Sequence, residues 1–166
     1  MVTVEDIKIL RDMTGAGIMD SKRALEESCG NVEIAQQILK DKGIATAAKK
    51  ASRETNEGLI HSYIHTGSRV GAIVEVNCET DFVARTDDLQ SLSTDLAMQI
   101  AAMSPKYVNS DEIEDSKEGD PEDLCLLSQP FIRDGSLTVQ DIVNETIAKV
   151  GENIRIRRFS RFALGE

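Results

Sequence analysis

The residues best suited to specific chemistry are Asp81 and Phe82, within the segment NCETDFVAR at positions 77–85. The segment follows an alternating apolar run, Val70 to Val76, that predicts a strand, and it precedes an amphipathic run, Leu89 to Met103, that predicts a helix. A turn between a strand and a helix normally faces solvent, so a carboxylate beside a large aromatic ring is an unusual pair there. Because only 4% of the chain is aromatic, Phe82 needs a specific role. Either it packs into the chain's own core, or it projects into a binding partner.

Patterns that would support catalysis or metal binding are weak in this sequence. His61 and His65 would point the same way on a predicted strand but lie about 13 Å apart, too far to share a metal ion. No cysteine pair has zinc-site spacing, and Gly15-Ala16-Gly17 is too short for a phosphate-binding loop and follows a helix. A nucleophilic Cys–His pair stays open, although no local signature supports one. We therefore expect no enzymatic activity, no metal and no cofactor.

Composition and charge narrow the class of protein and of partner. The chain has 166 residues, of which 40% are hydrophobic and 29% charged, with no membrane-length apolar run and no signal-peptide pattern. We therefore expect a cytoplasmic protein without a membrane partner. The net charge of −10 argues against direct nucleic-acid binding. Eight acidic residues and one lysine fall within residues 111–123, so we expect 109–123 to be a mobile acidic loop.

Three widely spaced cysteines, Cys29, Cys78 and Cys125, argue against a disulfide framework and indicate a reducing compartment. They are interpreted as small core residues, with an intermolecular disulfide as the alternative.

Residues 1–43 predict a domain of three short helices. Thr3 and Asp6 have the spacing of a capping box at the start of the first helix. That helix would bury one apolar face, formed by Val4, Ile7, Leu10 and Met13. A second helix is expected over about 19–28, and Asn31 would cap a third that ends at Gly43. The third helix would bury Ile34, Ala35, Ile38 and Leu39.

Residues 44–57 predict a partly helical, basic linker, and residues 58–166 predict an α+β core. The linker region is either solvated or a docking surface for an acidic partner, with basic side chains at Lys40, Lys42, Lys49, Lys50 and Arg53. The core would contain a hairpin over 59–76, the helix over 89–103, and a last helix between Thr138 and Gly151. A terminal strand from Ile154 would pair with the hairpin and carry a bulge at Arg157-Arg158. The prediction is a small antiparallel sheet covered by helices.

Several segments resemble the bacterial elongation factor Ts family, the guanine-nucleotide exchange factors for elongation factor Tu. They occur along the chain in the same order as in that family. They are TDFVA (80–84), LRDMTGAGIMDSKRAL (10–25), KGIATAAKKASRETNEGLI (42–60), QPFIRDGSLTVQDIV (129–143) and IAKVGENIRIRRFSRF (147–162). The resemblance covers roughly residues 3–103 and 125–166. The family's helical-hairpin insertion is replaced here by the short acidic connection, so its partner contacts are not carried over.

The resemblance implies a ubiquitin-associated-type fold for residues 1–43 and a role in releasing GDP from elongation factor Tu, in its GDP-bound and nucleotide-free forms. Phe82 would insert between helices of the partner's G domain, and Asp81 would help to disturb its magnesium ion. Thr80 and Val83 complete that magnesium-dislocation segment. Further partner-binding residues would be Arg11, Asp12, Met13, Gly15, Ile18, Met19 and Arg85.

Several alternatives stay open at this point. Met13, Ile18 and Met19 would otherwise fill the core of the bundle, and the arginines of the last strand would contact the partner or be solvated. The chain would otherwise be a protein-binding adaptor without exchange activity, or a factor that exchanges weakly because it lacks the hairpin. Longer family members carry two related core subdomains, so we expect this short chain to mimic them by forming a homodimer.

Overall fold

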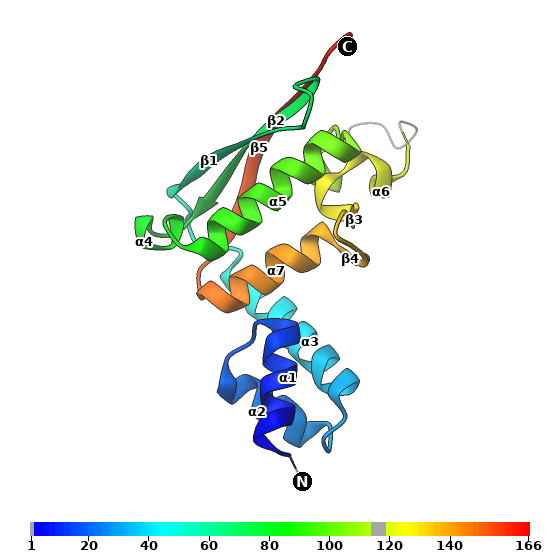
Figure 1. Cartoon of the computed structure of the whole chain (residues 1–166). Helices are drawn as coiled ribbons and strands as arrows, with labels where there is room; N and C mark the ends of the chain where they lie inside the picture. Colours follow the sequence, from blue (N-terminus) through cyan, green and yellow to red (C-terminus); the bar gives the residue numbers. More distant parts are fainter. Residues whose placement is uncertain (1, 114–118) are drawn as a thin grey trace.

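The computed structural model describes residues 2–113 and 119–166, with a helical bundle at one end and an α+β core at the other (Figure 1). This confirms the predicted fold class. The elements are α1 (Val4–Thr14), α2 (Ile18–Glu27), α3 (Val32–Lys50), β1 (Glu57–Ile64), β2 (Val70–Cys78), α4 (Asp81–Ala84), α5 (Asp87–Met103), η1 (Ser110–Glu112), α6 (Pro121–Leu124), η2 (Leu126–Ser128), β3 (Pro130–Phe131), β4 (Asp134–Thr138), α7 (Val139–Val150) and β5 (Ile154–Ala163).

The bundle begins as the capping pattern predicts. The Asp6 N–H donates to Thr3 Oγ1 at 3.1 Å, and the Thr3 N–H donates to Asp6 Oδ2 at 2.9 Å. Leu10, Ala24, Leu25 and Ala35 form a small, fully buried core. Val4 and Ile34 were expected in this core, but both are exposed. Three short helices enclose too little volume to bury every apolar position on their faces.

Helix α3 corrects the predicted helix end at Gly43, because the helix continues without a break to Lys50. Gly43 is buried against α7, where an added Cβ would lie 3.8 Å from Ala148 Cβ. The space left beside Gly43 would hold a methyl group, so packing of α3 against α7, and not a need for glycine, keeps the helix continuous despite the cost of about 1 kcal/mol for glycine inside a helix. The helical part of the predicted linker is therefore the second half of α3, and one helix belongs to both the bundle and the core.

The sheet has the order β1-β2-β5, and both pairings are antiparallel. Its register shifts between Glu75, which pairs with Arg158, and Val76, which pairs with Ile156. This places the predicted bulge at Arg157. Val74 and Val76 face the core beneath α5, whereas Ile73 faces outward, as the alternation predicts. The outer face carries four exposed apolar side chains, Ile60, Ile64, Ile73 and Phe162.

The hairpin of β3 and β4 was not predicted. It is fixed by Gln99 of α5, which donates to the Pro130 carbonyl at 3.0 Å and accepts from the Ile132 N–H at 2.8 Å. Between α5 and α7, Tyr107 also forms an isolated parallel bridge with Cys125. The predicted mobile loop falls partly on residues 114–118, outside the described residues, and η1 and α6 form its flanks.

Within the described residues, no helix is both long enough and apolar enough to cross a membrane.

Candidate functional site

The candidate site is α4, a single helical turn that follows β2 and projects from one end of the core (Figure 1). Thr80 caps this turn by accepting from the Val83 N–H at 3.4 Å. The Cys78 thiol donates to the Thr80 carbonyl at 3.1 Å, and the Thr86 hydroxyl donates to the Val83 carbonyl at 2.7 Å. A helix this short has no stability of its own, so these side-chain bonds fix its shape.

Phe82 and Val83 lie on different sides of α4, one facing solvent and the other facing the core. Phe82 is 77% exposed, whereas Val83 is 4% exposed and belongs to the main hydrophobic core. The interpretation of Phe82 as a core residue is therefore wrong. Burying an exposed aromatic ring against a partner would be strongly favourable, and such rings dominate many protein interfaces.

The charges beside the ring also point into solvent. Asp81 Oδ2 lies 2.8 Å from Arg85 Nη2, one helical turn away, and both side chains are mostly exposed. Exposed pairs of this kind contribute little to stability and are easily exchanged for other partners. The structure therefore brings together an acidic group, a basic group and an aromatic ring on one exposed turn.

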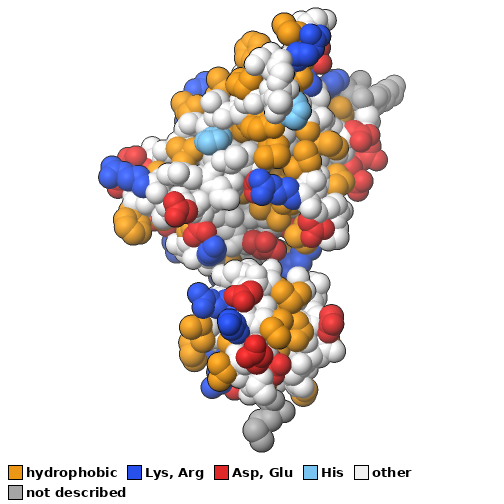
Figure 2. All heavy atoms as spheres, viewed as in Figure 1, with side chains coloured by type: hydrophobic (Ala, Val, Ile, Leu, Met, Phe, Trp, Pro, Cys, Tyr) orange, Lys and Arg blue, Asp and Glu red, His pale blue; other side chains and the backbone are white. Residues whose placement is uncertain are grey.

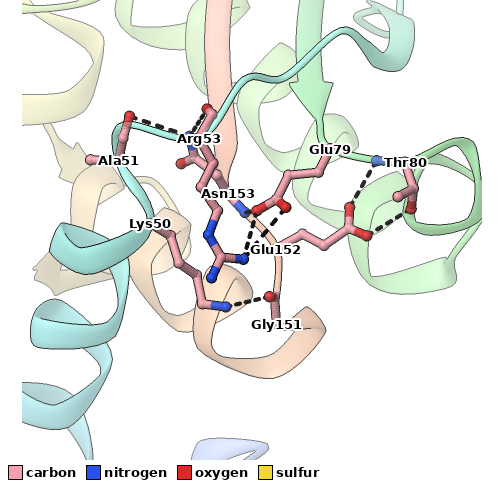
Figure 3. A network of polar contacts seen from close by, with 8 residues as sticks. All are labelled: Lys50, Ala51, Arg53, Glu79, Thr80, Gly151, Glu152 and Asn153. Atoms are coloured by element: carbon pink, nitrogen blue, oxygen red, sulfur yellow. Dashed lines mark hydrogen bonds and ion pairs between the residues drawn. The ribbon is translucent and has the colours of Figure 1, made fainter.

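Figure 3 shows the polar network that holds the start of α4. Glu152 accepts from the Thr80 N–H at 3.0 Å and from the Thr80 hydroxyl at 2.7 Å. Glu79 accepts from the Asn153 N–H at 2.7 Å and lies 3.4 Å from Arg53 Nη1. The bond from Asn153 and the charge of Arg53 hold the pKa of the Glu79 carboxyl below its ordinary value. Sequence reasoning missed Glu152 and Asn153, for which the only signal was their place after the helix stop Gly151.

Basic residues of the predicted linker are engaged within the chain. Lys40 pairs with Asp141 at 3.1 Å, Lys42 pairs with Glu27 at 2.9 Å, and Lys50 donates to the Gly151 carbonyl. These contacts join the bundle, α3 and the core to one another.

The exposed residues of the bundle form a second candidate surface. Met13, Ile18 and Met19 are all more than half exposed, so the interpretation that they fill the bundle core is wrong. Arg11, Asp12 and Gly15 are exposed as well. Met13 and Gly15 also line a cavity of about 500 Å³ between the bundle and α7. Figure 2 shows the bundle and the core as two lobes, so this surface and α4 lie on different lobes.

Arg157 and Arg158 of β5 are solvent-exposed and pair with a carboxylate of the neighbouring strand. Arg158 Nε lies 2.7 Å from Glu75 Oε2, and Arg157 lies 3.9 Å from the same carboxylate. Cys78 and Cys125 are buried free thiols, as expected, whereas Cys29 is exposed, which corrects its assignment to the core. Among the described residues, no group of three or more potential ligands is arranged to hold a metal ion.

Comparison with known proteins identifies the family. The family model described as Elongation factor TS matches residues 43–120. The chain is 47% identical to elongation factor Ts of Carboxydothermus hydrogenoformans over all of this chain and 90% of the relative. It is 45% identical to the protein of the same name from Moorella thermoacetica, covering 97% of that relative, and 48% identical to that of Heliobacterium modesticaldum, covering 91%.

These alignments extend over 196 positions, whereas this chain has 166 residues, so parts of the relatives have no counterpart here. Because the whole length of the chain aligns with these translation elongation factors at 45–48% identity, the chain belongs to the elongation factor Ts family.

Proposed function

We propose that this chain is a guanine-nucleotide exchange factor that binds elongation factor Tu, dislocates its magnesium ion and promotes release of GDP so that GTP can bind. The observation that carries the proposal is Phe82, an exposed aromatic ring on a turn anchored by the core, within a TDFVA segment of an elongation factor Ts family member. The chain itself makes and breaks no covalent bond in this function, which we place in the cytoplasm.

The mechanism follows from thermodynamic linkage. A GTPase holds its nucleotide through a phosphate-binding loop, a lysine and a bound magnesium ion. A protein that binds better to the nucleotide-free form must weaken nucleotide binding by the same factor. Phe82 supplies binding energy that is gained only when the partner's helices separate, and Asp81 supplies a negative charge that competes for the magnesium environment. Thr80 and Val83 act by holding these two side chains in place.

The bundle supplies a second contact with the same partner in this proposal. Its exposed residues Met13, Ile18 and Met19 are of the flexible or branched apolar types that fill shallow grooves. Two contacts on one rigid chain bind more tightly than either alone, because the second contact forms at a high effective concentration.

The test is the release of a fluorescent GDP analogue from elongation factor Tu, measured by stopped flow. Wild-type chain should accelerate release, and Phe82→Ala should lose most of the acceleration while staying folded. Ile132→Ala is the matched control, since Ile132 is also exposed but lies between β3 and β4, away from α4 (Figure 1). If wild type binds the partner without accelerating release, the chain is an adaptor and the proposal is wrong.

We further propose that two copies associate through the outer face of the sheet. Ile60, Ile64, Ile73 and Phe162 are exposed apolar side chains on that face, while α5 covers the opposite face. Glu75 and Arg158 lie in the same surface and can form complementary pairs across a two-fold axis. Sedimentation velocity should show a dimer for wild type and a monomer for Ile73→Lys. A monomeric wild type at high concentration would exclude this association.

A further inference from the structure

Glu152, in the turn between α7 and β5, binds the start of α4, which lies far away in the sequence. Both oxygens of the Glu152 carboxylate bind Thr80, which lies 72 residues earlier. The Thr80 hydroxyl donates to Glu152 and accepts from the Val83 N–H. A hydroxyl has one proton to donate, so the bond to Glu152 sets the direction of that proton and leaves the lone pairs free to cap α4.

Glu152 is itself fixed by its neighbours in the turn (Figure 3). Gly151 ends α7 in a left-handed conformation with φ of 79°, and its carbonyl accepts from Lys50 of α3. The Asn153 side chain donates to the Arg53 carbonyl at 2.9 Å, and its N–H donates to Glu79. The three-residue turn thus contacts the end of α3, the end of β2 and the start of α4.

We propose that Glu152 is a positioning residue, which orders α4 through Thr80 and so presents Phe82 to the partner in one direction. The proposal rests on the exchange function proposed above. A rigid, correctly directed ring loses less conformational entropy on binding than a mobile one, so disorder in α4 weakens the complex and slows GDP release. Glu152 does not need to touch the partner for this effect.

The chemistry of the carboxylate provides a selective test. Glutamine has nearly the shape of glutamate, but an NH2 donor replaces one of its two oxygens. Since the two Thr80 donors bind different oxygens of Glu152, Glu152→Gln in the same pose keeps only one of these bonds. Glu57→Gln is the matched control. Its charge also acts on Cys78, next to the same segment, but its carboxylate is not a partner of Thr80.

Order in α4 can be measured without any partner. The chain contains no tryptophan, so Phe82→Trp introduces a single fluorescent reporter at the position of interest. Time-resolved anisotropy of this variant should show little fast local motion. Adding Glu152→Gln should increase the amplitude of the fast motion, and adding Glu57→Gln should not. Unchanged local motion in the Glu152→Gln form would overturn the proposal.

Nucleotide release then tests whether this order matters for function. Glu152→Gln should lower the acceleration of GDP release roughly three- to tenfold, as expected for loss of one hydrogen bond of ordinary net strength. In a Phe82→Ala background the same change should alter release less than about twofold, because the residue acts through Phe82. Equal losses in both backgrounds would overturn the proposal.

The two proposals fail in different measurements. Failure of the exchange function appears in wild type, whereas failure of the Glu152 role appears only in the variants. If wild type does not accelerate release, the functional half of this proposal is overturned with it, and the anisotropy still decides whether Glu152 orders α4.

Discussion

Phe82 and Val83 are adjacent in α4, and one side chain points into solvent while the other packs in the core. Replacing each by alanine should therefore separate function from stability. Val83→Ala should lower the free energy of unfolding by about 1–3 kcal/mol, because it removes two buried methyl groups and leaves a cavity. Phe82→Ala should change it by less than about 0.5 kcal/mol. Urea unfolding of both variants checks this, and comparable losses would mean that the ring is packed.

Gly43 should tolerate alanine but not leucine. An added Cβ would lie 3.8 Å from Ala148 Cβ and 3.9 Å from the Asn144 carbonyl oxygen, which are ordinary contacts. Gly43→Ala should therefore raise the free energy of unfolding by about 0.5–1 kcal/mol through helix propensity. Gly43→Leu should lower it by about 1–3 kcal/mol by separating α3 from α7. Thermal unfolding of the two variants measures both changes. A destabilising alanine would show that the helices are already in tighter contact than these distances indicate.

The three thiols should react at very different rates. Burial raises the pKa of Cys78 to about 11, and burial also raises the pKa of Cys125. Both thiols then have little thiolate at pH near 8, and both are shielded from reagents, whereas Cys29 is exposed. Alkylation followed by mass spectrometry should show one fast site, which Cys29→Ser removes. Fast labelling of Cys78 in the native protein would indicate that the base of α4 opens frequently.

The Glu79 carboxylate should make the junction between α3, β2 and β5 sensitive to acid. Its pKa is lowered in the folded chain, so its contribution is complete above the ordinary glutamate pKa and is lost as pH falls through the lowered value. Between about pH 6 and about pH 3, wild type should therefore lose stability more steeply than Glu79→Gln, with the difference developing below about pH 4.3. Thermal midpoints over this range provide the measurement. Parallel curves for the two proteins would exclude a role for this group in acid unfolding.

Local patterns predicted the parts of the fold that depend on neighbours in sequence. The capping box of Thr3 with Asp6 involves residues three apart and forms as expected, and Thr138 forms the same box with Asp141 at the predicted start of the last helix. The bulge at Arg157 also follows from a local shift in the apolar pattern. The capping boxes are fixed by short-range hydrogen bonds, and the bulge is signalled by the apolar pattern of the last strand itself, so the sequence alone is sufficient to place them.

Features that depend on distant contacts were predicted less well. Gly43 is of the residue type that commonly ends a helix, but packing against α7 keeps it inside α3. The TDFVA segment could be identified from its sequence, whereas Glu152 could not, because its partner Thr80 lies 72 residues away. The direction in which Phe82 points could also be found only from the structure, because it is the neighbouring Val83 that packs into the core at that turn.

The continuity of α3 has a consequence for how any partner is recognised. Because one helix runs from the bundle into the core, the angular setting of the two lobes is determined by the number of residues in that helix. Each residue of an α-helix adds about 1.5 Å of length and about 100° of rotation. Inserting one alanine within 44–50 would thus rotate the exposed surface of the bundle that contains Met13, Ile18 and Met19 relative to Phe82. The length of α3 therefore fixes both the distance and the relative rotation between the two candidate surfaces, and a partner that binds both must match the two quantities together.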